Sequence, residues 1–458
     1  MEGLSVIHRI YIMVIFSVVL AMALKRDVMI LCLLGAFIIG TVYNRSIVGG
    51  LQTVFNTFLI GGIKLFEVIV VIALMTAMLK SLQAIGVHIL IIKPLRKLLS
   101  NPKTGFFILG VVMYLTSLFF WPTPATVMVG TLLLPAALQA GLSPIAAAIS
   151  INILGHGMAL SGDPVLQGAP RLSASAAGIP VESVLLKGLL LSLITGITAI
   201  IIAYFMNRKD IAKHKGIGAQ KTHELSNYFD IPMKKSVLFL FVLGITAIFF
   251  IILCVMITGR IKGKDATSLL GGSAVIVMVC SVIFHFNDRA PEKAAEFIKE
   301  GFLFAIKIFS PVIPIAGFFF MGSGESSLIL GECAPKLLFD IGEILSRKIP
   351  LNKVALAFGN LIIGIITGLD GSGFSGLPLT GGIASALGGP AGVDVSVLAA
   401  IGQLGAVWSG GGTLTAWGFG LVVTAGITGV PPAELARRNF IPVVSGLTAA
   451  TITGIFLM

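Results

Sequence analysis

Charged residues are scarce in this chain: Asp, Glu, Lys and Arg make up 11% of its 458 residues. An ordinary soluble domain carries about 25%. A chain this poor in charge cannot cover a water-facing surface, and no stretch has the composition of a separate soluble domain. The scarcity of charge therefore excludes an ordinary soluble protein.

Motifs of catalysis and metal binding are also missing. The four cysteines are dispersed without metal-ligand spacing and are interpreted as small buried apolar residues. The sequence contains no Gly-x-Ser-x-Gly elbow, His-Glu-x-x-His motif, phosphate loop or paired-aspartate motif of lipid-phosphate transferases. We therefore expect no enzyme activity, no metal and no cofactor apart from a coupling ion.

Apolar segments dominate what is present. Hydrophobic residues form 56% of the chain, the mean hydropathy is +1.02, and apolar stretches of roughly 20 residues, the length that spans a bilayer, recur throughout. The net charge of +12 comes from Lys and Arg in the short breaks between these segments, a pattern that orients membrane proteins rather than binding nucleic acid. The sequence predicts an all-α membrane protein with about 11 spans in the lipid bilayer and no nucleic-acid partner.

The order of elements repeats between the two halves of the chain. Residues 1–206 and 236–458 each hold three spans, a helix–break–helix unit, a second broken helix and a closing span, and the hydrophilic residues 207–235 link them. Such internal duplication is typical of transporters built from repeats. The predicted re-entrant hairpins lie at about 104–141 and 354–389, and the predicted broken helices at about 144–170 and 395–420.

The distribution of basic residues predicts the orientation. If both arms of the first hairpin leave from the cytoplasmic side, more Lys and Arg face the cytoplasm than the outside, and the linker 207–235 is cytoplasmic. Counting spans then places the second hairpin on the opposite side, so the two repeats have inverted topology. The expected location is the inner membrane of a bacterium, with many spans.

Four breaks rich in glycine, proline and hydroxyl residues interrupt otherwise apolar helices: Trp121–Thr126, Gly155–Pro164, Asp370–Gly376 and Trp408–Thr413. Backbone freed from helical hydrogen bonds inside a bilayer is tolerated only where protein or a water-filled cavity satisfies it. Broken helices also direct half-helix N-termini, which attract anions, toward the middle of the membrane. We expect the four breaks to meet in one polar site. The alternative is that their glycines only allow helices to pack closely.

Hydroxyl and carboxyl groups in these breaks are the candidate ligands. Four hydroxyl residues offer oxygen atoms that can hold a hard cation such as Na⁺: Thr123, Thr126, Ser372 and Ser375. Asp163 and Asp370 are candidate carriers of a proton or cation, because a carboxylate near the bilayer centre costs at least about 2.5 kcal/mol and is usually functional. Asp163 has an alternative role as the cap of the half-helix that follows, which is common for Asp before Pro.

Other polar residues have structural interpretations. Residues 47–62 are expected to form an interfacial helix ahead of a span at 65–85, with Lys64 and Glu67 paired near a helix end. Lys80 is expected to extend to the membrane surface. His156 is interpreted as packed or hydrogen-bonded rather than as a metal ligand, because no second ligand lies at suitable spacing.

Short motifs at the breaks resemble the ion transporter superfamily, which includes gluconate permeases, anaerobic C4-dicarboxylate carriers and citrate carriers. The stretch from Ile151 through Ser161-Gly162-Asp163-Pro164-Val165-Leu166 is similar to the Ser-Gly-Asp segment of the C4-dicarboxylate carriers, and Thr367–Gly373 to their Thr-Gly-Ser-Gly segment. Phe120–Gly141, followed by Leu142-Ser143-Pro144, is similar to the layout of gluconate permeases. The resemblance in layout spans nearly the whole chain.

The resemblance implies inverted repeats whose breaks meet at a midplane site, an elevator-like movement of one domain against a scaffold, and a homodimer. It also implies substrate contacts in all four breaks, at Thr123, Thr126, Ser161, Gly162, Asp163, Ser372, Gly373, Ser375, Ser409, Gly410 and Thr413. The Ser-Asn-Thr tips of sodium-coupled dicarboxylate symporters are replaced in this sequence, so both H⁺ and Na⁺ stay open as the coupling ion.

These observations predict a secondary active transporter that carries a small organic anion together with H⁺ or Na⁺. The expected substrate is a hydroxy acid, a sugar acid such as gluconate, or a di- or tricarboxylate. One alternative is a Na⁺/H⁺ antiporter that uses Asp163 and Asp370 and carries no organic substrate. A membrane enzyme or assembly factor is a third alternative, against which the missing catalytic motifs count.

Overall fold

The computed structural model describes residues 5–23, 28–87, 101–211, 263–322, 325–338 and 352–458, with a few single residues between them (99, 243, 244, 247, 251, 340, 341 and 344). All regular structure in these residues is helical, and they contain no strand. Five of their helical segments are long and apolar enough to cross a membrane, or six if a bent pair at 47–84 counts as one span. The prediction of an all-α protein with several membrane-crossing helices is confirmed.

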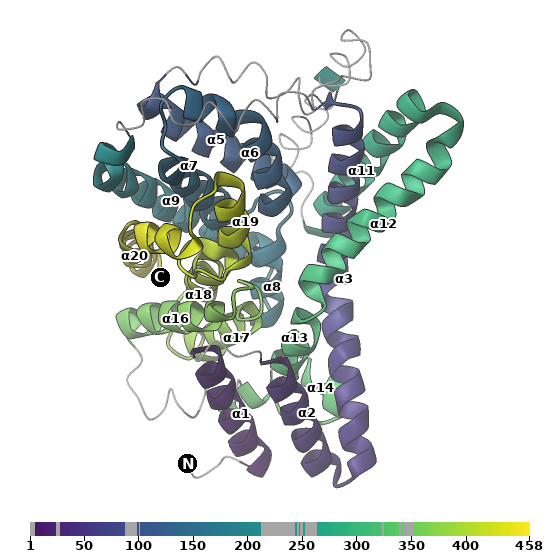
Figure 1. Ribbon diagram of the computed structural model, residues 1–458. Helices are drawn as coiled ribbons and strands as arrows, with labels where there is room; N and C mark the ends of the chain where they lie inside the picture. The colour runs from purple at the N-terminus through teal and green to yellow at the C-terminus, as the bar shows by residue number, and fades with distance from the viewer. Residues whose placement is uncertain are drawn as a thin grey trace.

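The helices form two groups, and each group contains helices from both halves of the chain (Figure 1). The group built around the long helix α3, called the α3 group, consists of α1 (Val6–Ala23), α2 (Met29–Asn44), α3 (Ile47–Ala84), α11 (Gly263–Phe286), η4 (Asn287–Arg289), α12 (Ala290–Phe309), α13 (Val312–Met321) and α14 (Ser326–Leu330). It occupies the right and lower part of Figure 1.

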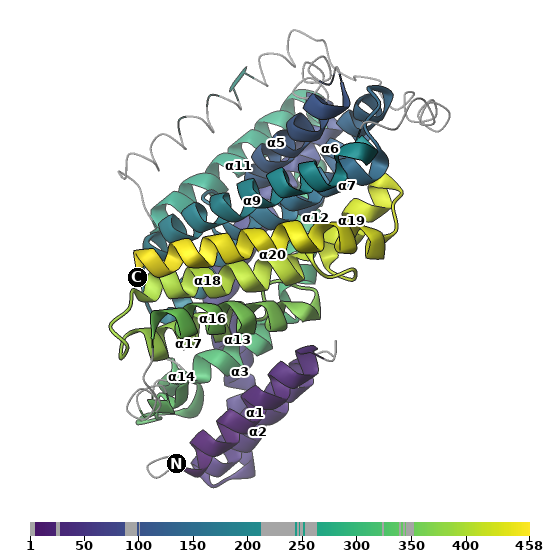
Figure 2. The same cartoon turned by 90° about the vertical axis from the view of Figure 1, so that its left-hand side faces the viewer.

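The remaining helices surround α18 and are called the α18 group. Its members are α5 (Pro102–Phe120), α6 (Pro122–Gln139), α7 (Pro144–Ile151), η2 (Asn152–Ala159), α8 (Gly168–Ala177), α9 (Val181–Ile211), α16 (Lys353–Thr367), η5 (Gly368–Asp370), α17 (Leu377–Gly388), α18 (Val395–Trp408), η6 (Ser409–Thr413), α19 (Phe419–Thr428) and α20 (Pro432–Leu457). Helices α9, α20, α18 and α16 run side by side in this group (Figure 2). All residues of α18 except the first are buried, which explains its largely apolar sequence.

Helix α3 pairs in antiparallel direction with α12 and α13. A methyl group added at Gly317 would lie 2.0 Å from the carbonyl oxygen of Thr57, and one added at Gly301 would lie 2.1 Å from that of Ala73. The residue numbers on α12 and α13 fall as those on α3 rise, which defines the antiparallel direction. Small residues at such crossings allow membrane helices to approach closely, so these glycines hold the α3 group together.

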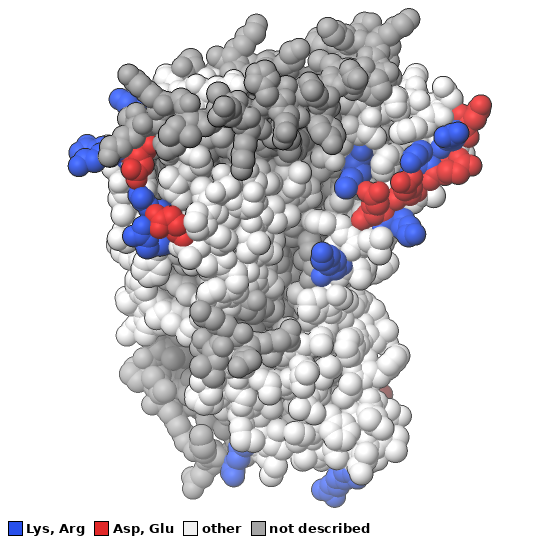
Figure 3. Space-filling model, viewed as in Figure 1, with Lys and Arg blue, Asp and Glu red and all other residues white. Residues whose placement is uncertain are grey.

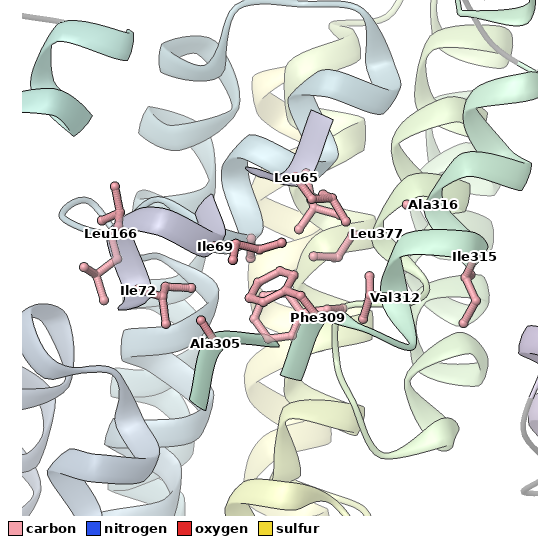
Figure 4. Packing of buried hydrophobic residues seen from close by; sticks show 14 of the residues in the cluster. Leu65, Ile69, Ile72, Leu166, Ala305, Phe309, Val312, Ile315, Ala316 and Leu377 are labelled. Carbon is pink, nitrogen blue, oxygen red and sulfur yellow. The ribbon is translucent and has the colours of Figure 1, made fainter. Parts of the chain in front are cut away.

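An apolar layer separates the α3 group from the α18 group. Figure 4 shows Phe309 of α12 beside Leu65 and Ile69 of α3 and Leu377 of α17. These side chains belong to one buried cluster, in which Phe309 is fully buried. The two groups therefore meet largely through apolar side chains, which have few directional interactions to break.

The outer surface fits a lipid environment. Large apolar side chains are exposed on both groups, including Phe55 of α3 and Leu186 of α9, with 65% and 67% of their surface exposed. On the face shown in Figure 3, charged side chains gather in the upper part and at the lowest tips, and a broad uncharged area separates them. Such extended apolar surface is unusual for a soluble protein and typical of a membrane protein.

Several expected elements differ from the structure or lie outside it. The predicted interfacial helix 47–62 and the predicted span 65–85 form one helix, α3. This helix bends by 47° between Glu67 and Ile69. Helix α9 extends to Ile211, beyond the predicted start of the linker, and the linker residues 212–235 lie outside the described residues. Most of residues 236–262, where the first span of the second half is expected, also lie outside them.

Candidate functional site

The first break is a turn at a single residue, Trp121, between α5 and α6. Its backbone has φ 62° and ψ 138°, outside the regions that L-residues prefer, and such a conformation costs of order 1–3 kcal/mol. The indole is buried, with 1% of its surface exposed. Because strain of this kind persists only where surrounding contacts hold it, the position of the Trp121 ring is strongly constrained.

The second break lies between η2 and α8 and is shorter than predicted. Residues Gly155, His156 and Gly157, expected to interrupt the helix, continue from α7 into the π-helix η2. A π-helix takes in an extra residue per turn while keeping backbone hydrogen bonds, so these glycines cause no break. The chain leaves helical geometry only at residues 162–167.

The third and fourth breaks depend on glycines with positive φ. In the turn between η5 and α17, Gly371 and Gly373 have φ 86° and 71°. Helix α18 continues as the π-helix η6 until Gly412, where φ is 108° and ψ is 51°, and the chain then turns toward α19. Glycine adopts these conformations without the steric cost that a side chain brings.

All four breaks lie against one another. The Trp121 ring stacks on the ring of Phe374 in the third break, with centroids 5.4 Å apart and an interplanar angle of 24°. A methyl group added at Gly168, the first residue of α8, would lie 3.1 Å from the indole. One added at Gly373 would lie 2.4 Å from the backbone nitrogen of Gly411 in η6. The breaks of the two halves therefore form one cluster.

The two π-helices cross within this cluster. A methyl group at Gly157 of η2 would lie 2.4 Å from the ring of Trp408, the last residue of α18. The side-chain amide of Asn152 donates to the carbonyl oxygen of Gly412 at 2.7 Å, and Asn439 of α20 donates to the Asn152 oxygen at 2.7 Å. These buried amides satisfy backbone that the break leaves without a helical partner.

Ser161 and Gly162, both predicted to contact substrate, have contacts within the fold. The Ser161 hydroxyl accepts from the Trp408 indole at 2.9 Å and lies 2.7 Å from the Ser192 hydroxyl of α9. Its carbonyl oxygen accepts from the side chain of Gln403 at 2.7 Å. A methyl group at Gly162 would lie 2.7 Å from Ser192. Both residues thus hold the second break against α9 and α18.

Asp163 caps the loop that leads into α8. One carboxylate oxygen accepts the backbone N–H groups of Val165 and Leu166, at 3.0 and 2.8 Å, and the other accepts that of Gly168 at 3.3 Å. The residue is buried, with 3% of its surface exposed. Three backbone donors are the arrangement of a helix cap, which is the alternative role considered for this residue.

Three of the predicted hydroxyl residues donate to backbone carbonyl oxygens. The hydroxyl of Thr126 donates to the carbonyl oxygen of Pro122 at 2.8 Å, that of Ser409 to Ile365 at 2.9 Å, and that of Thr413 to Trp408. Each residue is buried. Backbone carbonyl groups therefore use part of the hydrogen-bonding capacity of these hydroxyls.

In the third break Ser372 is half-buried and Ser375 is buried. The hydroxyl of Ser372 donates to that of Ser375 at 3.1 Å and accepts the backbone N–H of Phe374 at 3.2 Å. Gly410 packs on the backbone of Gly373. The backbone of the remaining candidate, Asp370, lies in η5, and its side chain lies outside the described part of the chain.

Several buried polar atoms of the cluster form no hydrogen bond among the described residues. They include the indole nitrogen of Trp121, the hydroxyls of Ser117 and Thr123, and both ring nitrogens of His156. His156 is fully buried, and its ring lies edge-on to that of Phe419 at 5.8 Å. Unsatisfied buried polar groups are rare in native proteins, so this cluster has capacity for a polar ligand.

Sequence reasoning missed three amide residues that hold the site together: Asn152, Gln403 and Asn439. All three are fully buried. The signal that could have identified them is their polarity, because uncharged polar side chains inside otherwise apolar membrane helices are energetically costly. Their position beside breaks predicted from glycine content would have marked them as supports of the site.

A pocket opens beside the first break. Its volume is about 360 Å³, and it lies between α3, α12 and the beginning of α6, where Thr123 lines it. The described residues contain no group of three or more His, Cys, Asp or Glu side chains that could hold a metal ion. The chemistry available to a ligand is therefore that of hydroxyls, backbone groups, imidazole and the charged side chains around this pocket.

Comparison with known proteins places the chain among membrane proteins. No family model matches it. It is 36% identical over 463 residues to the uncharacterized membrane protein YhfA of Bacillus subtilis (strain 168), an alignment that covers 100% of this chain and 99% of YhfA. An identity of this size over the full length of both chains reflects a shared fold, and the chain belongs to the family of membrane proteins that includes YhfA.

Proposed function

We propose that the protein is a secondary active transporter of small organic anions: hydroxy acids, sugar acids such as gluconate, or di- and tricarboxylates. The observation that carries the proposal is the convergence of four interrupted helices from both halves of the chain, marked by the stacking of Trp121 on Phe374. Interrupted helices that meet inside a membrane protein are the usual architecture of transporter binding sites. The unsatisfied Thr123 and His156 atoms give this cluster polar groups for a ligand.

The two helix groups support an elevator-like mechanism. The α18 group contains all four breaks, and it meets the α3 group largely through apolar side chains such as Phe309 and Leu377. A contact of this kind allows one group to slide against the other without the loss of many hydrogen bonds. We propose that the α18 group carries the anion, together with H⁺ or Na⁺, across the bacterial inner membrane in a homodimer whose 207–235 linker is cytoplasmic.

The geometry of Asp163 argues against this residue as the ion carrier of a Na⁺/H⁺ antiporter. An antiporter needs a carboxylate that is free to exchange ions, whereas both oxygens of Asp163 accept backbone N–H groups. Asp163 is therefore better suited to holding α8 in place than to carrying a proton.

Reconstitution into liposomes tests the proposed function. Purified protein is expected to accumulate at least one of ¹⁴C-labelled gluconate, citrate, succinate or lactate when an inward H⁺ or Na⁺ gradient is imposed, and protein-free liposomes are the control. Absence of accumulation across this panel under both gradients would overturn organic-anion transport. Proton movement on addition of Na⁺ alone, reported by an internal pH dye, would identify an antiporter instead.

A further inference from the structure

The pocket beside the first break is lined by one face of each of three helices. Helix α3 contributes Thr76, Lys80 and Gln83, spaced so that they share a helical face, and α12 contributes Glu300. Helix α6 contributes Thr123 from its first turn. The pocket thus lies between the α3 group and the α18 group, where the proposed movement takes place.

Two opposite charges meet in this pocket. The ammonium nitrogen of Lys80 lies 3.3 Å from a carboxylate oxygen of Glu300, and their side chains are 48% and 40% exposed. The next residue, Gly301, packs directly on the carbonyl oxygen of Ala73, so α3 and α12 are in backbone contact at the pocket. An exposed pair of this kind contributes little to stability. Lys80 can therefore release Glu300 and bind a ligand instead with little loss of folding free energy.

The beginning of α6 adds positive partial charge to the pocket. Pro122 and Pro124 have no backbone N–H, and the N–H of Ala125 donates to Trp121. The backbone N–H of Thr123 is therefore the donor in the first turn of α6 that an acceptor outside the helix can use. The Thr123 hydroxyl is buried and has no hydrogen-bond partner among the described residues, so the charge of the helix end rather than this hydroxyl acts on the pocket. A helix N-terminus with free donors attracts negatively charged groups.

We propose that this pocket binds a carboxylate group of the transported anion, with Lys80 as the cationic ligand and the first turn of α6 at Thr123 as the source of positive partial charge. Glu300 acts as an internal competitor that occupies Lys80 when no anion is bound. The proposal rests on the proposed transport function for the identity of its ligand. It assigns opposite roles to the two members of one ion pair, since removal of Lys80 weakens anion binding and removal of Glu300 strengthens it.

A cysteine introduced at Val127 reports the charge preference of the pocket. Val127 lines the pocket and is 44% exposed. In detergent-solubilised V127C, the rates of labelling by anionic MTSES and cationic MTSET are measured by peptide mass spectrometry, which separates this site from the native cysteines. One unit charge about 6 Å away changes each rate by about threefold in water. We therefore expect Lys80→Gln to lower the MTSES/MTSET ratio about tenfold and Glu300→Gln to raise it about tenfold.

Lys293→Gln is the matched control. Lys293 lies on α12 like Glu300 but pairs with Glu296 at 2.6 Å away from the pocket lining, so its removal changes net charge without changing the ratio. Ratios that change less than twofold in both Lys80→Gln and Glu300→Gln, or that shift in the same direction, overturn the proposal.

Protection from labelling tests carboxylate binding directly. Citrate, gluconate, succinate or lactate is expected to slow MTSES labelling of V127C, to require higher concentrations in Lys80→Gln, and to act at lower concentrations in Glu300→Gln. Protection by none of the four overturns the site. If liposomes accumulate an anion that gives no protection, transport stands and this pocket is not its binding site. If an anion protects but is not accumulated, the site stands and the transport proposal fails.

Discussion

Arg171 of α8 forms an ion pair with Glu67 of α3, with 2.9 Å between Nη1 and Oε1. The pair joins the α18 group to the α3 group at the point where α3 bends by 47°. The Arg171 side chain is 9% exposed and that of Glu67 is 32% exposed, so water screens the attraction incompletely. A sliding movement of one group along the other would have to break this pair.

Replacement of either partner tests this link. We expect Arg171→Met and Glu67→Gln each to lower the free energy of unfolding by about 1–3 kcal/mol, between the values for exposed and buried pairs. The double variant should lose less than the sum of the two, because the partners interact directly. Thermal unfolding in detergent measures all three. Strictly additive losses would show that the pair does not join the groups in solution.

Gly373 should be irreplaceable because two constraints act on it. Its φ is 71°, and a methyl group would lie 2.4 Å from the nitrogen of Gly411. Gly373→Ala is therefore expected to be about 1–3 kcal/mol less stable than the matched control Gly178→Ala. Gly178 has a similar φ of 68° but open space around it, so the control isolates the cost of backbone strain. Equal unfolding temperatures for the two variants would contradict contact between the third and fourth breaks.

The fold class was predictable because long apolar segments with few charges have only a helical solution inside a bilayer. The ion pairs were not predictable from the sequence. Lys64 and Glu67 were expected to pair with each other, but Lys64 contacts Glu325 and Glu67 contacts Arg171. Residues three apart on a helix suggest a local pair, whereas the partners chosen here depend on how distant helices pack.

Candidate site residues were predictable as a group and less so one by one. Glycine, proline and hydroxyl clusters marked the four breaks, and the structure brings these breaks together. The continuation of η2 through Gly155-His156-Gly157 was not predictable, because a π-helix depends on tertiary contacts such as that between Gly157 and Trp408. The role of Lys80 depends in the same way on Glu300, which follows it by more than 200 positions in the chain.

Gly420 determines the packing of His156. A methyl group at Gly420 would lie 2.1 Å from the imidazole and 2.5 Å from the carbonyl oxygen of Gly411, and overpacking of this kind costs about 1–3 kcal/mol. Gly420→Ala should therefore lower the unfolding temperature in detergent. Gly426→Ala, on the same helix with open space around it, should raise it slightly, because alanine in a helix is about 0.5–1 kcal/mol more stable than glycine. A Gly420→Ala variant as stable as Gly426→Ala would contradict the placement of His156.

Substitutions of Asp163 test whether its carboxylate has a structural role or carries an ion. Asparagine retains a side-chain oxygen that can accept the N–H groups of Val165 and Leu166 and loses the bond to Gly168. We expect Asp163→Asn to remain folded and to keep most of the anion uptake measured in liposomes. Asp163→Ala should lose about 0.5–2 kcal/mol of stability, as other helix caps do, and lose uptake with it. A folded Asp163→Asn variant without gradient-driven uptake would instead assign Asp163 to ion coupling, since the cap would survive while the exchangeable proton would not.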